Sequence, residues 1–156
     1  IDTHYPLLGE PWQIMIQTSG AIKMVPLDAQ MQMNINSLEA LSLMPQQIEH
    51  FVMVWYFKQA HHCFSERITY YRSKLNVVNP ILKLSRAKTR WGSCNSRGVI
   101  HLNWRLIQLP IELIDYVVAH ELSHLVEMNH SPAFWQEVAS IYPDYKMARM
   151  RLKEYG

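Results

Sequence analysis

Two histidines four residues apart, with a glutamate directly after the first, occur inside an apolar stretch of the chain, as His120-Glu121-Leu122-Ser123-His124. On an α-helix, residues four apart lie one above the other, so His120 and His124 present their imidazole nitrogens to one point. A tetrahedral Zn²⁺ can bridge nitrogens at that separation. The side chain of Glu121 is rotated away from the direction of the two ligands, so its carboxylate can reach a metal-bound water rather than the metal itself. The pattern predicts a helix with a metal ion beside it.

Two histidines do not complete a catalytic zinc site, which usually has three protein ligands and one water. We predict His130 as the third ligand. The helix is expected to end near Glu127-Met128, with Asn129 in the left-handed conformation of a tight exit, which turns His130 back toward the metal. The spacing equals that of the third histidine in the metzincin signature H-E-x-x-H-x-x-G-x-x-H, although Glu127 stands at the glycine position.

Two alternatives to this ligand set remain. Glu127 or Glu137 could take the place of His130, as a glutamate does in some zincins. Cys94 could be a fourth ligand, but it would then block the position that water needs.

A long helix is predicted upstream of this site. Pro45 can serve as its first residue, and the helical pattern runs to about Leu75. His61 and His62 point about 100° apart on this helix and cannot easily face one metal, so we predict that they are surface or capping groups. The predicted apolar face consists of Ile48, Phe51, Trp55, Cys63, Phe64, Ile68, Tyr71 and Leu75.

Alternation of apolar and polar residues predicts strands in two regions. In the first, Trp12–Thr18 and Ala21–Pro26 form a hairpin around Ser19-Gly20, and Met31–Ile35 alternates again. The second region follows Asn79-Pro80, with strands at 81–85, 90–94 and 99–104 and a turn at 95–98. Its last two strands are predicted to form an antiparallel hairpin that leads directly into the next helix.

Three helices are predicted after these strands. Pro110 opens the helix that carries His120. Ser131-Pro132 opens the next one, with the serine as N-cap, and Pro143 opens a last helix to about Glu154. The chain therefore has an α+β pattern. No repeat, linker or low-complexity tract divides it, so we predict one domain over residues 1–156.

Composition narrows the compartment and the partners. With 156 residues, of which 49% are hydrophobic, the chain can bury a core without disulfides. No run of about 18 apolar residues occurs, so no membrane span is expected. Asp2 and Pro6 interrupt the segment where a signal peptide would be basic and then apolar. Because the two cysteines fit a reducing compartment, we expect a cytoplasmic location.

Charge is distributed unevenly along the chain. Residues 67–111 contain nine Lys and Arg residues and no acid, whereas residues 112–144 contain six acids and no Lys or Arg. We expect the two blocks mainly to pair with each other; the alternative is a basic rim that attracts an anionic substrate. The sequence does not indicate nucleic-acid binding, because it has no basic tail, zinc ribbon or aromatic-interleaved basic groove.

Four segments resemble the YgjP-like metallopeptidase family, which is grouped with the SprT-like and WLM zincin-type proteins. They are Thr89–Cys94, Ile100–Leu106, Asp115–Leu125 and Asn129–Trp135, and the motif-bearing part runs from about Leu82 to Tyr145. The resemblance implies a zincin-like fold, in which a small antiparallel or mixed sheet packs on the long helix and on the H-E-x-x-H helix. It also implies one Zn²⁺ per chain, held by His120, His124 and His130, with Glu121 as the catalytic acid and base.

These observations predict a zinc-dependent hydrolase, a metallopeptidase acting on a peptide or protein. Glu121 would take a proton from a zinc-bound water as this water attacks the scissile carbonyl. The edge strand Thr89–Cys94 would offer backbone groups to an extended peptide. A further donor for the transition state could come from His101, Arg90, Arg105 or Tyr145.

Two other functions remain open. In the first, the same metal site hydrolyses a nucleoside triphosphate, an activity that the family resemblance also carries, although the chain has no Gly-rich phosphate loop. Its phosphates would lie on the basic residues Lys83, Arg86, Lys88, Arg90 and Arg97. In the second, the domain is a non-catalytic, zinc-stabilised interaction module.

Overall fold

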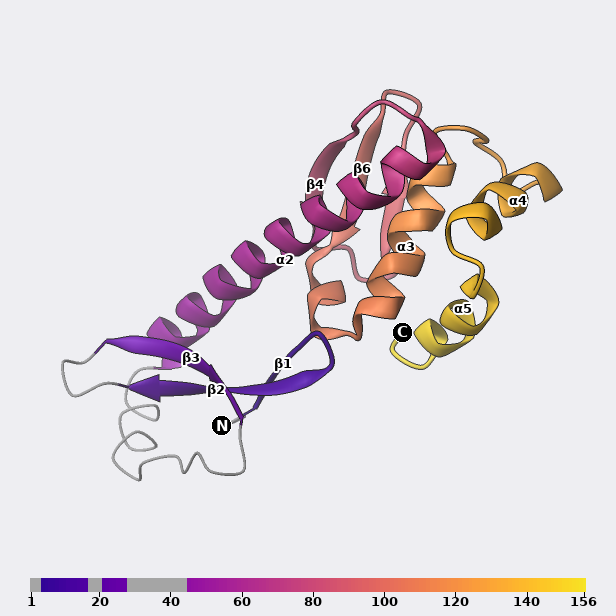
Figure 1. Cartoon of the computed structure of the whole chain (residues 1–156). Coiled ribbons are helices and arrows are strands. Elements are labelled where there is room, and N and C mark those ends of the chain that lie inside the picture. The colour runs from indigo at the N-terminus through magenta and orange to yellow at the C-terminus, as the bar shows by residue number, and fades with distance from the viewer. Residues whose placement is uncertain (1–3, 17–20, 28–44) are drawn as a thin grey trace.

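The structure is a computed structural model and describes residues 4–16, 21–27 and 45–156. Two small sheets, four α-helices and a short 3₁₀ helix make up the described part of the chain, an α+β arrangement as predicted. The first sheet lies at one end of the long helix α2, and the second sheet and the remaining helices gather around its other end (Figure 1). None of the described helices combines the length and the apolar composition that a bilayer crossing requires.

The first sheet is an antiparallel meander of β1 (Tyr5–Leu7), β2 (Glu10–Ile16) and β3 (Ile22–Pro26). Leu8 and Gly9 join β1 to β2 with φ angles of 52° and 82°, the left-handed values of a two-residue hairpin turn. Their backbone N–H groups donate to the carbonyls of Ile107 and Gln108 at 2.7 and 3.0 Å. The tip of this hairpin is thereby attached to the segment that precedes α3.

The predicted N-terminal hairpin is confirmed. β2 pairs antiparallel with β3, from Trp12 opposite Pro26 to Ile16 opposite Ile22. The predicted turn at Ser19-Gly20 and the predicted strand at Met31–Ile35 lie outside the described residues.

The long helix is confirmed as α2 (Pro45–Leu75), with His61 and His62 exposed. Its predicted apolar face is incomplete: Phe51, Trp55, Cys63 and Leu75 are half-buried and pack against the core, but three buried residues were not predicted. The row of residues spaced by four winds around the helix, which contacts the first sheet near its beginning and α3 further along. The buried residues are Ile48, Val52, Tyr56, Ala60, Phe64, Ile68 and Tyr71.

The second sheet is mixed and has the order β4-β6-β5. Its strands are β4 (Ile81–Ser85), β5 (Gly92–Cys94) and β6 (Val99–Asn103). β5 and β6 form the predicted antiparallel hairpin, and β4 joins β6 in parallel. Ile100 and Leu102 are fully buried on the face of β6 that meets the core. This sheet places the edge strand β5 beside α3.

One feature between the sheet and α3 differs from the prediction. The strand does not lead directly into the helix, because the 3₁₀ helix η1 (Trp104–Gln108) intervenes. Asn103 caps η1: its side-chain oxygen accepts a hydrogen bond from the N–H of Arg105 at 3.0 Å. Trp104 therefore belongs to η1 and not to the strand.

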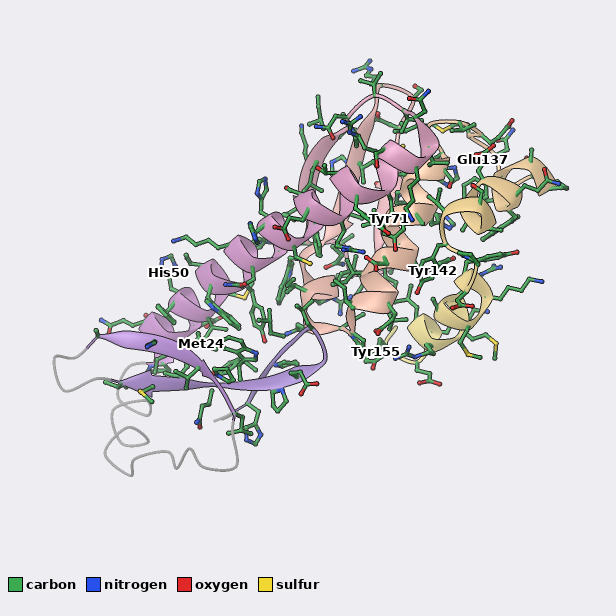
Figure 2. The ribbon with its side chains drawn as sticks, in the orientation of Figure 1. Met24, His50, Tyr71, Glu137, Tyr142 and Tyr155 are labelled. Atoms are coloured by element: carbon green, nitrogen blue, oxygen red, sulfur yellow. The ribbon has the colours of Figure 1, made fainter. Side chains whose placement is uncertain are left out.

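The last three α-helices are α3 (Ile111–Ser123), α4 (Pro132–Ile141) and α5 (Tyr145–Lys153). α3 lies between α2 and the pair formed by α4 and α5 (Figure 1). Tyr142, at the C-terminal end of α4, approaches Tyr71 of α2 with ring centroids 6.3 Å apart (Figure 2). Its hydroxyl donates a hydrogen bond to the backbone carbonyl of Glu112 on α3 at 3.0 Å. α5 begins at Tyr145 and not at Pro143 as predicted.

The two charge blocks meet in a single ion pair within the part of the chain that the structure describes. Arg67 donates to both carboxylate oxygens of Asp115, at 2.6 and 3.0 Å, and so joins α2 to α3. Arg86 and Arg105 lie instead over the rings of Phe57 and Trp91. The expectation that the blocks mainly pair with each other is therefore wrong, and most of the basic block faces solvent.

Candidate metal centre

Three histidines converge where α3 ends and α4 begins. His120 lies in the last turn of α3, His124 caps that helix, and His130 precedes α4. One nitrogen of each ring lies within 4.8 Å of the others, and the Nε2 atoms of His120 and His130 are 3.2 Å apart. A tetrahedral zinc ion with ordinary Zn–N distances places its ligand nitrogens roughly 3.4 Å apart. The three imidazoles therefore fit a small divalent cation.

The alternative ligands do not join this group. Within the described residues, the cluster that could hold a metal contains neither Glu127, Glu137 nor Cys94. Glu137 lies on α4 (Figure 2).

The chain reaches His130 by a different path from the one predicted. α3 ends at Ser123 rather than near Glu127, but His124 keeps right-handed helical angles of −66° and −17°, which preserves the four-residue spacing from His120. Asn129 does not have the positive φ that we expected. Ser131 caps α4 as predicted, since its hydroxyl accepts a hydrogen bond from the Phe134 N–H at 3.3 Å.

Polar groups behind two of the rings direct their Nε2 atoms toward the centre. The Tyr116 hydroxyl lies 3.4 Å from Nδ1 of His120, and the Glu127 carbonyl lies 3.3 Å from Nδ1 of His124. A hydrogen on each Nδ1 satisfies these contacts and leaves Nε2 as the electron-pair donor.

Electrostatics keep the rings of His120 and His124 neutral. Burial, together with the neighbouring histidines and the positive charge of Arg149, lowers the pKa of His120 to about 3. Burial also lowers the pKa of His124. Neutral imidazole is the form that binds metals, so both rings are ready for binding near neutral pH.

Aromatic side chains of α4 hold the rings in place. Phe134, which is fully buried, stacks on His124 with centroids 4.4 Å apart and meets the other two rings at their edges. Trp135 stacks on His130 at 6.1 Å and on Tyr145 of α5 at 5.4 Å. The metal centre is therefore packed against two helices that follow it in the sequence.

Glu121 lies next to the histidines, under the edge strand β5. Its side chain is only 6% exposed. A Cβ atom on Gly92 of β5 would lie 3.1 Å from both Cγ and Oε2 of Glu121 and 3.1 Å from Val117. Only a glycine lets the strand pass this close to the carboxylate.

The carboxylate of Glu121 has no polar partner in the described part of the chain: no hydrogen bond or ion pair engages it. Burial raises its pKa from 4.5 to about 7, against the opposing effect of the positive charge on Arg90. A buried carboxyl without a partner lowers stability when it ionises, so its retention points to a chemical role.

We expect a pH-dependent stability difference between the wild type and Glu121→Gln. Because the folded state raises the pKa of this carboxyl, its contribution is complete below about pH 4.5 and is lost as pH rises toward 7. The metal-free Gln variant should therefore gain stability relative to the wild type across that interval, by on the order of 3 kcal/mol. Urea unfolding at both ends of the interval measures the difference, with Glu112→Gln in the exposed first turn of α3 as control. A pH-independent difference would contradict the assignment.

We also expect Gly92→Ala to impair the site without emptying it. The added methyl group would press on Glu121 and Val117, so stability should fall by roughly 1–3 kcal/mol. Turnover should fall by about tenfold because the carboxylate is displaced. The capacity to bind a metal ion should stay at the wild-type level, since no histidine is touched. Thermal unfolding, elemental analysis and initial rates report these three effects, and a variant with unchanged turnover would contradict the close contact.

The four candidates for a further donor lie in different places. Arg90 is near enough to Glu121 to lower its pKa, whereas His101 points away from α3 on the opposite side of the sheet. The Arg105 guanidinium lies 4.9 Å from the Trp91 ring, and Tyr145 stacks on Trp135.

Sequence reasoning missed three residues of this centre. Tyr116 stands four positions before His120, and this spacing could have identified it as a partner on the same helix face. Phe134 stacks on His124, and the sequence analysis did not predict this contact. Gly92 and Glu121 are far apart in the sequence, so no local sequence pattern predicts the contact between them.

Comparisons with known proteins agree with this geometry. The crystal structure of the metallopeptidase zymogen of Pyrococcus abyssi abylysin is similar, with 22% identity and a TM-score of 0.56 over 59% of this chain and 93% of that one. That of Methanocaldococcus jannaschii jannalysin, also a metallopeptidase zymogen, has 17% identity and a TM-score of 0.53 over 59% of this chain and 95% of that one. The TM-scores of these two structures show a similar fold. No curated protein sequence matches the chain. The model of the YgjP-like metallopeptidase domain matches residues 2–155, and the chain therefore belongs to the YgjP-like metallopeptidase family.

Proposed function

We propose that the chain is a zinc-dependent peptidase in which His120, His124 and His130 hold the ion and Glu121 is the general base. The observation that carries the proposal is the meeting of three imidazoles, two of them with lowered pKa, beside a buried carboxylate that no hydrogen bond or ion pair engages. Three nitrogen ligands leave a fourth tetrahedral position for water or substrate, as catalytic zinc sites require. Bound zinc would supply a Lewis acid that polarises the scissile carbonyl and makes water more acidic.

Glu121 performs the proton transfers. Its carboxylate accepts a proton from the attacking water as the water oxygen forms a bond to the carbonyl carbon. It then donates that proton to the amine nitrogen as the C–N bond breaks. A carboxyl whose pKa is raised to about 7 suits both steps, because it can take up and release a proton near neutral pH.

The open edge of β5 provides the place for an extended peptide. β5 is the last strand of its sheet, and no strand of the described residues pairs with its outer edge. Gly92 brings the β5 backbone against Glu121. A peptide that adds to this edge would therefore lie beside the general base, held by main-chain hydrogen bonds.

Purified protein loaded with zinc, tested on a library of unstructured peptides and separately on nucleoside triphosphates, tests this proposal. We expect cleavage of peptide bonds, loss of activity on chelation and no release of pyrophosphate. Release of pyrophosphate without peptide cleavage would overturn the proposal in favour of nucleotide hydrolysis. Inactivity on both substrates, with zinc bound, would support a non-catalytic module.

A further inference from the structure

A polar pocket of about 250 Å³ is lined in part by Gly92, the residue of the edge strand β5 that contacts Glu121. Side chains alternate between the two faces of a sheet. Ile100 and Leu102 face the core, so His101 faces the opposite side, and its cross-strand partner Ser93 faces the same way. The lining residues are Ser85, Ala87, Arg90, Gly92, Ser93 and His101.

The wall of this pocket is held by a buried asparagine. The Asn103 side-chain amide donates to the carbonyls of Ala87 and Arg90 at 2.7 and 3.1 Å, and its backbone N–H donates to the Trp91 carbonyl at 2.8 Å. Asn103 is completely buried. The loop that carries Arg90 is thereby fixed against the sheet, which gives the pocket a defined shape.

The charge of the pocket is positive and unbalanced. Arg90 is exposed, and no carboxylate of the described residues lies within ion-pair distance of it. Lys83 stands opposite His101 in the parallel pair of β4 and β6, so it faces the same side. Residues 67–111, which contain the whole sheet, include no acid. An anionic group entering the pocket would therefore meet a guanidinium that forms no ion pair with a carboxylate of the described residues.

We propose that this pocket binds the carboxylate of an acidic residue in the peptide substrate, a specificity that rests on the function proposed above. In a peptide paired with the outer edge of β5, the residue opposite Ser93 places its side chain on the same face as Ser93 and His101. Arg90 can then hold the carboxylate, with the Ser93 hydroxyl and the His101 ring beside it. Arg90 is thus a specificity-determining residue.

The dimensions of the pocket favour a side chain over a nucleotide. Sites for molecules of nucleotide size usually occupy roughly 300–1,000 Å³, and this pocket is smaller. It has no Gly-rich loop whose backbone N–H groups could surround a chain of phosphates. A single carboxylate needs only one guanidinium fork and a few polar neighbours.

Pairs of peptides that differ only by Glu or Gln at one position test the proposal. The substituted position is moved through three residues on either side of the cleaved bond. With zinc-loaded wild type, we expect one position at which the Glu peptide has a kcat/KM on the order of tenfold above that of the Gln peptide. Arg90→Gln should bring this ratio close to one. Arg97→Gln, which removes the same charge from the exposed turn between β5 and β6, should keep the wild-type ratio.

Binding gives a second readout that does not depend on turnover. Titration of the same peptides into zinc-loaded Glu121→Gln should show tighter binding of the Glu peptide, and adding Arg90→Gln should remove the difference. Equal cleavage and equal binding of every pair would overturn the acidic specificity and leave the peptidase function intact. Absence of any peptide cleavage by the wild type, with Arg90-dependent binding of a nucleoside triphosphate, would overturn both proposals.

Discussion

Substitution of Glu121 by alanine is expected to lower kcat by about 10²–10⁴-fold, the range usual for loss of a general acid-base group. The reason is that Glu121 directly follows His120 on α3 and that no hydrogen bond or ion pair in the described part of the chain engages its buried carboxylate. The variant should still bind zinc, because Glu121 is not among the three converging ligands. Steady-state kinetics on a cleaved peptide, together with elemental analysis of the same preparation, measure both effects.

The controls separate chemistry from folding. Glu112→Ala removes an exposed carboxylate from the first turn of the same helix and should leave turnover unchanged. Glu121→Gln keeps the side-chain volume but cannot accept the proton, so it should be as inactive as Glu121→Ala. A Glu121 variant that retains wild-type turnover would remove this residue as the base.

Loss of the first histidine should have a different signature. His120→Ala is expected to abolish stoichiometric zinc and, with it, all turnover, since two imidazoles remain where a catalytic site needs three protein ligands. Zinc stabilises the folded state in proportion to its affinity for that state. The rise in melting temperature that zinc gives the wild type should therefore disappear in the variant. Elemental analysis and thermal unfolding with and without zinc provide the measurement.

A matched substitution shows whether the effect is specific. His61→Ala changes a histidine that is exposed on α2, far along the chain from the cluster, and should keep both the zinc and the thermal shift. If His120→Ala still bound one equivalent of zinc, the three-histidine centre would be wrong.

The local parts of the structure could be predicted because they depend on local chemistry. The helix predicted from Pro45 to about Leu75 has the same ends as the observed α2. Ser131-Pro132 likewise predicts the observed start of α4. The convergence of His120 and His124 follows from the helical repeat alone. These features need no knowledge of what packs against them.

The non-local parts could not be predicted. β4 pairs in parallel with β6, and the buried face of α2 winds around the helix. Both features depend on which other elements of the fold pack against the strand or the helix. The path to His130 was wrong in detail, because ordinary turns at the end of α3 replace the left-handed residue expected at Asn129. The aromatic packing of Phe134 on the imidazoles likewise appears only once α4 folds back on α3.

The charge pattern shows the same limit. A sequence reveals that residues 67–111 lack acids, but not whether basic side chains meet carboxylates, aromatic rings or water. In the structure Arg67 meets Asp115, Arg86 and Arg105 lie over rings, and Arg90 faces a pocket. Only coordinates distinguish these outcomes.

The arrangement of the imidazoles on two helices has a mechanical consequence. His120 and His124 belong to the end of α3, and His130 belongs to the connection that leads into α4. Trp135 of α4 in turn stacks on Tyr145 of α5. An ion bound by all three would act as a cross-link between consecutive helices. Loading the centre would thus tie α4 and, through Trp135, α5 to the core of the molecule, so catalytic competence and rigidity of these two helices would arise together.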